Sequence, residues 1–73
     1  MRYLVTGGSG GLGQAVCAEL LHRGGDVIVF GPRRAPLALG EHDALHWVQS
    51  DVRDGHHLPR VVKEQRVDVI VAA

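Results

Sequence analysis

Five glycines stand within seven positions near the start of the chain: Gly7, Gly8, Gly10, Gly11 and Gly13. Because glycine is entropically costly to order, such a cluster indicates either a disordered linker or a backbone that another group approaches closely. The apolar run 2–6 before it predicts a strand. The apolar spacing of three and four residues over 11–22 predicts a helix. A glycine turn between a strand and a helix presents free N–H groups and the positive end of the helix dipole, so it predicts a phosphate site.

Two glycine spacings in this turn fit a dinucleotide. Gly8-x-Gly10-x-x-Gly13 is the general fingerprint, and Gly7-x-x-Gly10-x-x-Gly13, preceded by Thr6, is a wider one. A P-loop is excluded because no Lys-Ser/Thr pair follows the last glycine. A glycine pattern alone is a weak signal, but here the strand and the helix that it requires are both present. The turn therefore predicts a pyrophosphate site, with a purely structural turn as the alternative.

The remaining elements follow from apolar runs and breaks. We expect strands at 26–30, 44–49 and 67–73, a second helix at 58–66, and polar loops at 31–42 and 51–57. Gly24 is placed to end the first helix. That helix is expected to pack through four apolar residues: Leu12, Ala15, Val16 and Leu20. The order β-α-β-β-α-β predicts an α/β fold with parallel strands in a doubly wound sheet.

Composition sets limits on partners and compartment. The chain has 73 residues, which allows at most one domain, and a formal net charge of zero, which gives no reason to expect nucleic acid or an anionic membrane. Its one cysteine, Cys17, cannot form an internal disulfide. It shows neither the zones of a signal peptide nor an apolar run of membrane-spanning length. We expect a cytoplasmic chain without nucleic-acid or membrane partners.

With its glycine turn, the sequence resembles the short-chain dehydrogenase/reductase superfamily. "TGGSGGLG" after "RYLV" satisfies Thr-Gly-x-x-x-Gly-x-Gly of the classical branch through Gly11 and Thr-Gly-x-x-Gly-x-x-Gly of the extended branch through Gly10. "SDVRD" at 50–54 and "VDVIVAA" at 67–73 resemble segments of the extended, epimerase/dehydratase-like branch. A classical ketoreductase fragment stays an alternative, because Gly11 replaces a frequent aromatic residue and no His precedes the final Ala-Ala.

The resemblance implies a partial Rossmann fold with strand order 3-2-1-4, spanning 1–73 as the N-terminal part of an NAD(P)-binding domain. It also implies cofactor-binding residues: Thr6, Gly7, Gly8, Ser9, Gly10, Gly11, Leu12, Gly13, Asp51 and Val52. Asp51 would accept from the adenine amino group, and Val52 would supply backbone contacts. The alternative for Asp51 is a turn or helix cap.

The end of the second expected strand bears on the choice between NAD and NADP. An acid there binds the ribose 2′-hydroxyl of NAD, whereas a nearby arginine accommodates the 2′-phosphate of NADP. Phe30 is followed by Gly-Pro-Arg33-Arg34, with no acid before Glu41. Guanidinium groups pair with phosphate bidentately, so Arg33 and Arg34 favour NADP over NAD. The alternative is a pair of solvated loop arginines.

Catalytic residues are not found. The superfamily uses a tyrosine with a lysine four residues later, but the only tyrosine is Tyr3 and the only lysine is Lys63. We therefore expect the cofactor-binding segment of an oxidoreductase or epimerase/dehydratase, with hydride transfer in the parent protein. The alternative is a non-catalytic dinucleotide- or partner-binding module.

The run 67–73 would leave an uncovered edge strand, and helices covering the second face are expected to be missing. We therefore expect completion by the rest of a parent chain, or a homo-oligomer.

Other conspicuous residues have ordinary explanations. The five histidines include the pairs His42/His46 and His56/His57, but neither pair has a cysteine or an acid at a known ligand spacing, so no metal site is expected. Cys17 is expected to be a small buried residue of the first helix. Trp47 is expected to pack against a helix, and with one phenylalanine it forms no stacking platform for nucleic acid.

Overall fold

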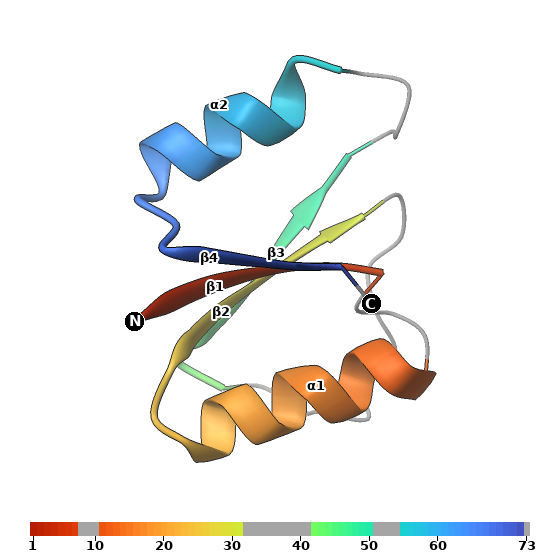
Figure 1. Ribbon diagram of the computed structural model, residues 1–73, viewed down its shortest axis with the longest axis vertical. Coiled ribbons are helices and arrows are strands. Elements are labelled where there is room, and N and C mark those ends of the chain that lie inside the picture. Colours follow the sequence, from red (N-terminus) through yellow and green to blue (C-terminus); the bar gives the residue numbers. More distant parts are fainter. Residues whose placement is uncertain (8–10, 32–41, 51–54, 73) are drawn as a thin grey trace.

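A single parallel sheet organises the chain. The computed structural model describes residues 1–7, 11–31, 42–50 and 55–72. Its elements are β1 (Arg2–Thr6), α1 (Gly11–His22), β2 (Asp26–Gly31), β3 (Leu45–Gln49), α2 (His57–Glu64) and β4 (Val69–Ala72). All strand pairs are parallel, and the sheet order is β3-β2-β1-β4 (Figure 1). The predicted element order, the partial Rossmann fold and the strand order 3-2-1-4 are confirmed.

The boundary between α2 and β4 differs from the expected one. The sequence predicts a helix to residue 66 and a strand from 67, whereas α2 ends at Glu64 and β4 begins at Val69. The backbone N–H of Arg66 donates to Lys63 O at 3.4 Å, and that of Val67 donates to Val62 O at 3.1 Å. These two bonds form a Schellman motif. Arg66 has a φ of 53°, so the chain leaves the helical path there.

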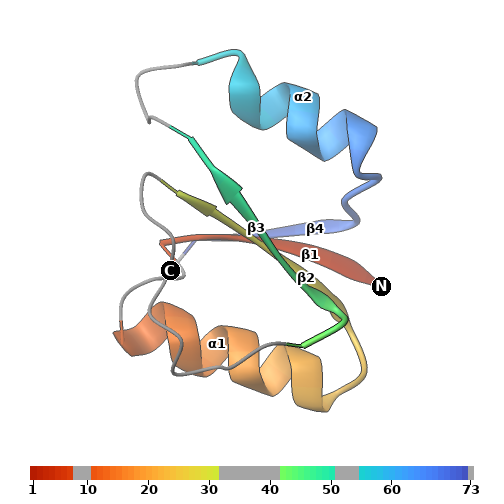
Figure 2. The same cartoon turned by 180° about the vertical axis from the view of Figure 1, so that it is seen from behind.

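The two helices cover opposite faces of the sheet (Figures 1 and 2). On the α1 face, a core cluster contains Val5, Cys17, Val27, Val29 and Leu45. On the α2 face, a second cluster contains Leu4, Ile28, Phe30 and Val61. Neighbouring residues of β1 and β2 alternate between these clusters because side chains alternate along a strand. The expectation that the second face lacks a covering helix is therefore wrong, since α2 packs there through Val61.

The packed face of α1 also differs from the predicted stripe. The buried residues of α1 are Gly13 and Cys17, and Val16 and Leu20 pack partly against the cluster. Leu12 is 72% exposed. Two small residues, Gly13 and Cys17, therefore lie against the sheet, which allows close helix–strand packing. The positions of large apolar side chains, on which a hydrophobicity pattern mainly depends, therefore do not identify the packed face of α1.

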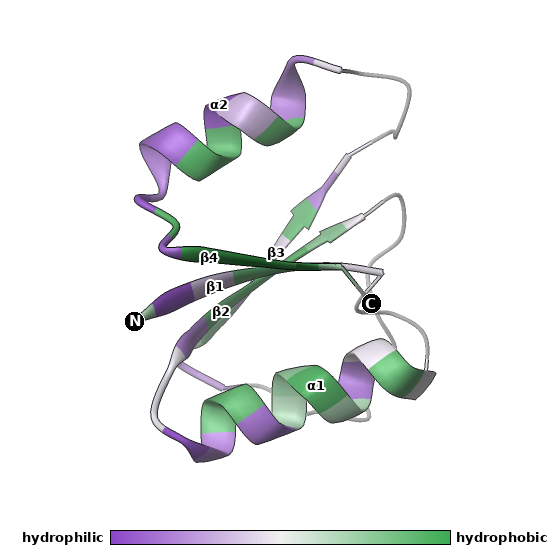
Figure 3. Ribbon diagram, viewed as in Figure 1, coloured by the Kyte–Doolittle hydropathy of each residue, from purple (hydrophilic) through white to green (hydrophobic). Residues whose placement is uncertain are grey.

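The edge strand β4 is apolar along its length (Figure 3). It pairs with β1 on one side, from Tyr3↔Val69 to Thr6↔Ala72. Val69 is 36% exposed and Ile70 is 51% exposed. This agrees with the expectation of an uncovered strand at this end of the sheet.

Cys17 is buried as predicted, and Trp47 packs on the same face of the sheet. Cys17 is fully buried, and burial raises the pKa of its thiol. Trp47 in β3 is half-buried against the cluster that includes Cys17. Within the described ranges no three metal-ligating side chains lie together. Neither helix in those ranges is long and apolar enough to cross a membrane.

Candidate functional site

The chain begins a turn directly after β1. Gly7 follows Thr6 with a φ of 74°, in the left-handed region that side-chain-bearing residues rarely adopt. α1 then begins at Gly11. The glycine turn predicted between strand and helix is therefore bounded by Thr6 and Gly7 on one side and by Gly11 on the other. Gly8, Ser9 and Gly10 lie outside the described residues.

The N-terminus of α1 is open and carries no acid in its first turn. Gly11 is exposed, and a Cβ built on it would meet nothing within 4 Å. The packing of the described residues therefore does not require glycine at position 11. Unpaired N–H groups and the positive dipole end favour an anion at such a helix start. The described geometry fits a phosphate group, which needs backbone approach without a side chain in the way.

Further along the helix, Leu12 and Gly13 have different surroundings. Leu12 projects into solvent, whereas Gly13 is buried on the face that packs against the sheet. A glycine there allows close contact between helix and strand, which is the role of the third glycine in a dinucleotide fingerprint. The structure thus brings Thr6, Gly7, Gly11, Leu12 and Gly13 to one edge of the sheet.

At this carboxyl end of the sheet, the connections between strands change from one face of the sheet to the other. α1 connects β1 to β2 on one face, and α2 connects β3 to β4 on the other (Figures 1 and 2). The reversal falls between β1 and β4, whose last paired residues are Thr6 and Ala72. Open α/β sheets bind ligands outside the carboxyl ends of their strands at such a switch point.

The other predicted cofactor residues follow β2 and β3. β2 ends at Gly31 without an acid, and Arg33 and Arg34 come two and three residues later, outside the described residues. Asp51 and Val52, which come directly after Ser50, also lie outside them. Their roles stay predictions. The described carboxyl ends of β2 and β3 lie at the same edge of the parallel sheet as the glycine turn.

Sequence reasoning missed a contact between β2, β3 and α2. Ser50 is buried, and its N–H donates to Gly31 O at 2.8 Å. Ser50 Oγ and His57 Nδ1 share a hydrogen bond. The His57 ring lies edge-on to Phe30, with centroids 5.4 Å apart and planes at 64°. Nothing in the spacing of these three residues pairs them, because the contact depends on the tertiary arrangement.

Tyr3 and Lys63 lie on different sides of the sheet. Tyr3, in β1, lies beside Gly25, on the α1 side. Lys63 is in the last turn of α2, which covers the opposite face. The two side chains are therefore not arranged as the tyrosine–lysine pair of the superfamily.

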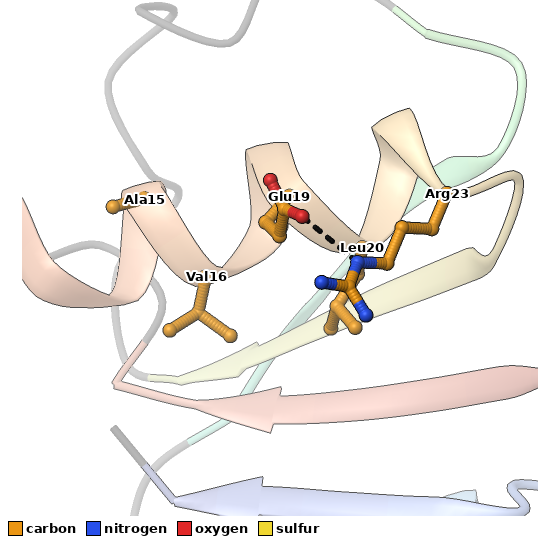
Figure 4. A pocket seen from close by; sticks show the side chains of 5 residues that line it. All are labelled: Ala15, Val16, Glu19, Leu20 and Arg23. Carbon is orange, nitrogen blue, oxygen red and sulfur yellow. Dashed lines mark hydrogen bonds and ion pairs between the residues drawn. The ribbon is translucent and has the colours of Figure 1, made fainter.

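A hollow of about 380 Å³ runs along α1 and is lined by Ala15, Val16, Glu19, Leu20 and Arg23 (Figure 4). Val16 and Leu20 point from the helix towards the sheet. At its exposed side Arg23 Nε donates to Glu19 Oε1 at 2.8 Å. This ion pair lowers the pKa of Glu19 and raises the pKa of Arg23. The hollow is mainly apolar, and none of its described lining residues belongs to the predicted phosphate site.

A second hollow, of about 330 Å³, has charged walls and lies at the opposite edge of the sheet. Its lining residues are Met1, Arg2, Asp26, Arg66 and Asp68. The backbone N–H of Arg2 donates to Asp68 Oδ2 at 2.7 Å. These residues belong to the amino ends of the strands, so this hollow is separate from the predicted cofactor site.

Comparisons with known proteins agree with this geometry. The chain is 28% identical to the UDP-glucose 4-epimerase of Klebsiella pneumoniae, over 97% of this chain and 56% of that protein. A solved dTDP-glucose 4,6-dehydratase of Bacillus anthracis, in complex with NAD, superposes with a TM-score of 0.83 at 29% identity, over 99% of this chain and 26% of that one. The Bordetella bronchiseptica enzyme WbmG, in complex with NAD, gives a TM-score of 0.84 at 25% identity, over 100% of this chain and 24% of that one.

The chain thus spans about half the length of the curated relative and about a quarter of the solved structures. A family model described as the NAD dependent epimerase/dehydratase family matches residues 3–73. Of the described elements, this match covers both helices, three strands in full and β1 from its second residue, and it spans the glycine turn. The resemblance inferred from the glycine turn is confirmed, and the chain belongs to the NAD-dependent epimerase/dehydratase family.

Proposed function

We propose that the chain binds the pyrophosphate of NAD(P) at the turn between β1 and α1. The observation that carries this proposal is the glycine geometry at the switch point. Gly7 turns the backbone in a left-handed conformation, and Gly11 begins α1 at a position where a Cβ would meet no described atom within 4 Å. The N–H groups of that helix start would donate to the phosphate oxygens. The NAD complexes of two similar structures support the proposal.

The rest of the cofactor would lie along the carboxyl ends of β2 and β3. Asp51 would accept from the adenine amino group, and Val52 would contact it through the backbone. Gly8, Ser9 and Gly10 would complete the phosphate turn. When bound, the nicotinamide would supply the hydride acceptor or donor. We place this chain as the nucleotide-binding segment of an oxidoreductase or epimerase/dehydratase, in which residues beyond this segment would hold the substrate.

We further propose a preference for NADP over NAD. β2 ends at Gly31 without a carboxylate, and Arg33 and Arg34 follow closely in the sequence. A carboxylate would repel a 2′-phosphate, whereas a guanidinium group pairs with it. Both solved relatives named above are complexes with NAD, so this preference would be a departure within the family.

A titration separates the two proposals. The protein that carries this chain is titrated with NAD, NADP, AMP and 2′,5′-ADP, and binding is followed by calorimetry. We expect saturable binding of both dinucleotides, with 2′,5′-ADP tighter than AMP. Substituting Arg33→Ala together with Arg34→Ala should weaken 2′,5′-ADP by about tenfold and leave AMP within twofold, since a lost charge-assisted hydrogen bond costs about that much.

The outcomes are distinguishable. Equal binding of AMP and 2′,5′-ADP would overturn the NADP preference and leave the nucleotide site intact. Failure of both dinucleotides to bind at millimolar concentration would overturn the nucleotide site itself. Arg60→Ala is the matched control, because this exposed arginine of α2 belongs to neither predicted segment.

A further inference from the structure

We propose that Arg2 and Asp68 set the register of β4 on β1, and thereby act as positioning residues for the switch point at the far end of these two strands. Both residues lie at the amino ends of the strands and line the charged hollow there. Neither is among the residues predicted to bind the cofactor. The binding consequence of this inference rests on the proposed function, whereas the register of β4 is measured independently of it.

Three hydrogen bonds, which we call the Arg2–Asp68 clamp, join the start of β1 to the connection between α2 and β4. The backbone N–H of Arg2 donates to Asp68 Oδ2 at 2.7 Å, and the backbone N–H of Asp68 donates to Arg2 O at 2.8 Å. Arg2 Nη1 donates to the carbonyl oxygen of Gln65, the C-cap of α2. A guanidinium group there also complements the helix dipole. Arg2 is therefore bonded to both ends of the segment 65–68, which leads from α2 into β4.

The side chains of β4 specify its register weakly. The strand reads Val-Ile-Val-Ala, so both of its faces are apolar (Figure 3). In the observed register Val71 packs against the cluster that contains Val5, on the α1 face. A shift by one residue would bring Ile70 and Ala72 to that face and so exchange one apolar set for another. Strands whose two faces are alike are prone to slip. The clamp supplies the contact that distinguishes one register from the others.

A change of register at the start of β4 would also move its carboxyl end. Ala72 pairs with Thr6, and Gly7 begins the turn directly after Thr6. One residue of a strand corresponds to about 3.3 Å, which is longer than a typical hydrogen bond. Open α/β sheets bind ligands in the crevice at a switch point, which here lies between the ends of β1 and β4. The clamp therefore determines which residue of β4 lies beside the start of the glycine turn.

The test compares two substitutions at Asp68. Asp68→Ala removes the carboxylate that accepts the Arg2 N–H, whereas Asp68→Asn keeps an oxygen that can accept it. Arg2→Met removes the bond to Gln65 from the other side and keeps an unbranched side chain, so it gives the same test should Asp68→Ala not fold. Asp26→Ala is the matched control, because it removes a carboxylate from the same hollow but no bond of the clamp.

Nuclear Overhauser effects between backbone protons of paired residues, such as Leu4 and Ile70, report the register directly. We expect Asp68→Ala and Arg2→Met to lose part of these signals and to gain those of a shifted register. Their affinity for NAD, measured by calorimetry, should fall by about three- to tenfold, because the fraction in the native register binds. Asp68→Asn and Asp26→Ala should keep the parent register and bind NAD within twofold of the parent protein. The thermal midpoint of each variant establishes that it is folded.

Each other result counts against a stated claim. If folded Asp68→Ala and Arg2→Met keep the parent register, the clamp does not set it and the inference is overturned. If the register shifts while NAD binds as tightly as before, the positioning role is wrong although the nucleotide site stands. If Asp26→Ala shifts the register as much, or Asp68→Asn does not restore it, loss of charge is the cause and the inference also fails. If the parent protein binds no dinucleotide, the proposed function fails and the positioning role falls with it.

Discussion

Glycines stand at both ends of α1, with Gly11 as the first residue and Gly24 and Gly25 just beyond the last. At the C-terminal end the chain itself requires them. Gly24 has a φ of 81°, and its N–H donates to Leu21 O at 3.0 Å. The N–H of Gly25 donates to Leu20 O, also at 3.0 Å, which completes a Schellman motif.

Gly25 is required for a different reason, which is lack of space. A Cβ at that position would lie 2.8 Å from Tyr3 Cε2 and 3.1 Å from Leu20 O. Gly11 has neither a left-handed φ nor a close neighbour. Gly31 and Gly55 have equally open surroundings, so it is the place of Gly11 at the start of α1, next to the glycine turn, that motivates the proposed phosphate contact. The comparison therefore separates glycines that the fold requires from one for which we propose a role in binding.

The largest expected effect is on stability, at Gly25. Gly25→Ala forces a methyl group against the Tyr3 ring and against the Leu20 carbonyl, which is held in place by its bond to the Gly25 N–H. Overpacking of this kind costs about 1–3 kcal/mol. We expect that loss in the free energy of unfolding, measured by denaturant titration and Trp47 fluorescence.

Gly55→Ala is the control for this prediction. A Cβ there would meet nothing within 4 Å, so this variant should be as stable as the parent or slightly more stable. If Gly25→Ala were as stable as Gly55→Ala, the close approach to Tyr3 would have no energetic meaning. Lack of space would then no longer explain the glycine at position 25.

The next effect is on binding, at Gly11. Gly11→Asp places a carboxylate at the start of α1, where it complements the helix dipole and should stabilise the fold by about 0.3–1 kcal/mol. The same carboxylate would repel a pyrophosphate. We expect dinucleotide affinity to fall by at least about tenfold, since like charges a few ångströms apart interact by several kcal/mol near a protein surface. Calorimetry and denaturant titration on the same samples measure both changes.

For Gly11→Asp, the distinguishing result is a gain in stability together with a loss of dinucleotide affinity. Ala18→Glu, at an exposed position of the same helix, adds the same charge away from the helix start and should leave affinity within twofold. A Gly11→Asp protein that binds dinucleotide as tightly as the parent would mean that no phosphate approaches this helix start.

The elements of the fold were predictable because their signals are local. Apolar runs marked the four strands, and the glycine turn and Gly24 marked the two ends of α1. The packed face of α1 was mispredicted in part: Gly13, which has no side chain and gives no hydrophobic signal, is buried, whereas Leu12 is exposed. α2 ends earlier than predicted because Arg66, which has no helix-stopping character, takes the left-handed position that ends it.

The candidate site was only partly predictable. Thr6, Gly7, Gly11 and Gly13 follow from motif spacing, and the structure places them at one edge of the sheet. The contact between Ser50 and His57 could not be predicted, because it depends on how α2 docks over β2 and β3. The roles of residues such as Arg33 and Asp51 stay predictions, since they lie outside the described residues.

The C-terminal end of α2 has a residue in the same left-handed position as the C-terminal end of α1. Arg66 holds the same cap position as Gly24, with a φ of 53°, but it carries a side chain. A left-handed conformation costs a side-chain-bearing residue about 1–2 kcal/mol, and glycine recovers part of this while gaining entropy in the unfolded chain. We expect Arg66→Gly to raise the free energy of unfolding by about 0.5–1 kcal/mol, measured by denaturant titration.

Arg66→Ala separates backbone conformation from charge. Both substitutions remove the guanidinium group from beside Asp26 and Asp68, but alanine keeps the left-handed strain. If only Arg66→Gly gains stability, the gain comes from the backbone conformation. Gly24 and Arg66 would then end their helices in the same way, one without and one with conformational strain. If Arg66→Ala gains as much, charge at this edge of the sheet would be the cause. In that case the left-handed φ of Arg66 would have no measurable energetic cost. The argument that Gly24 must be glycine because of its left-handed φ would then fail as well.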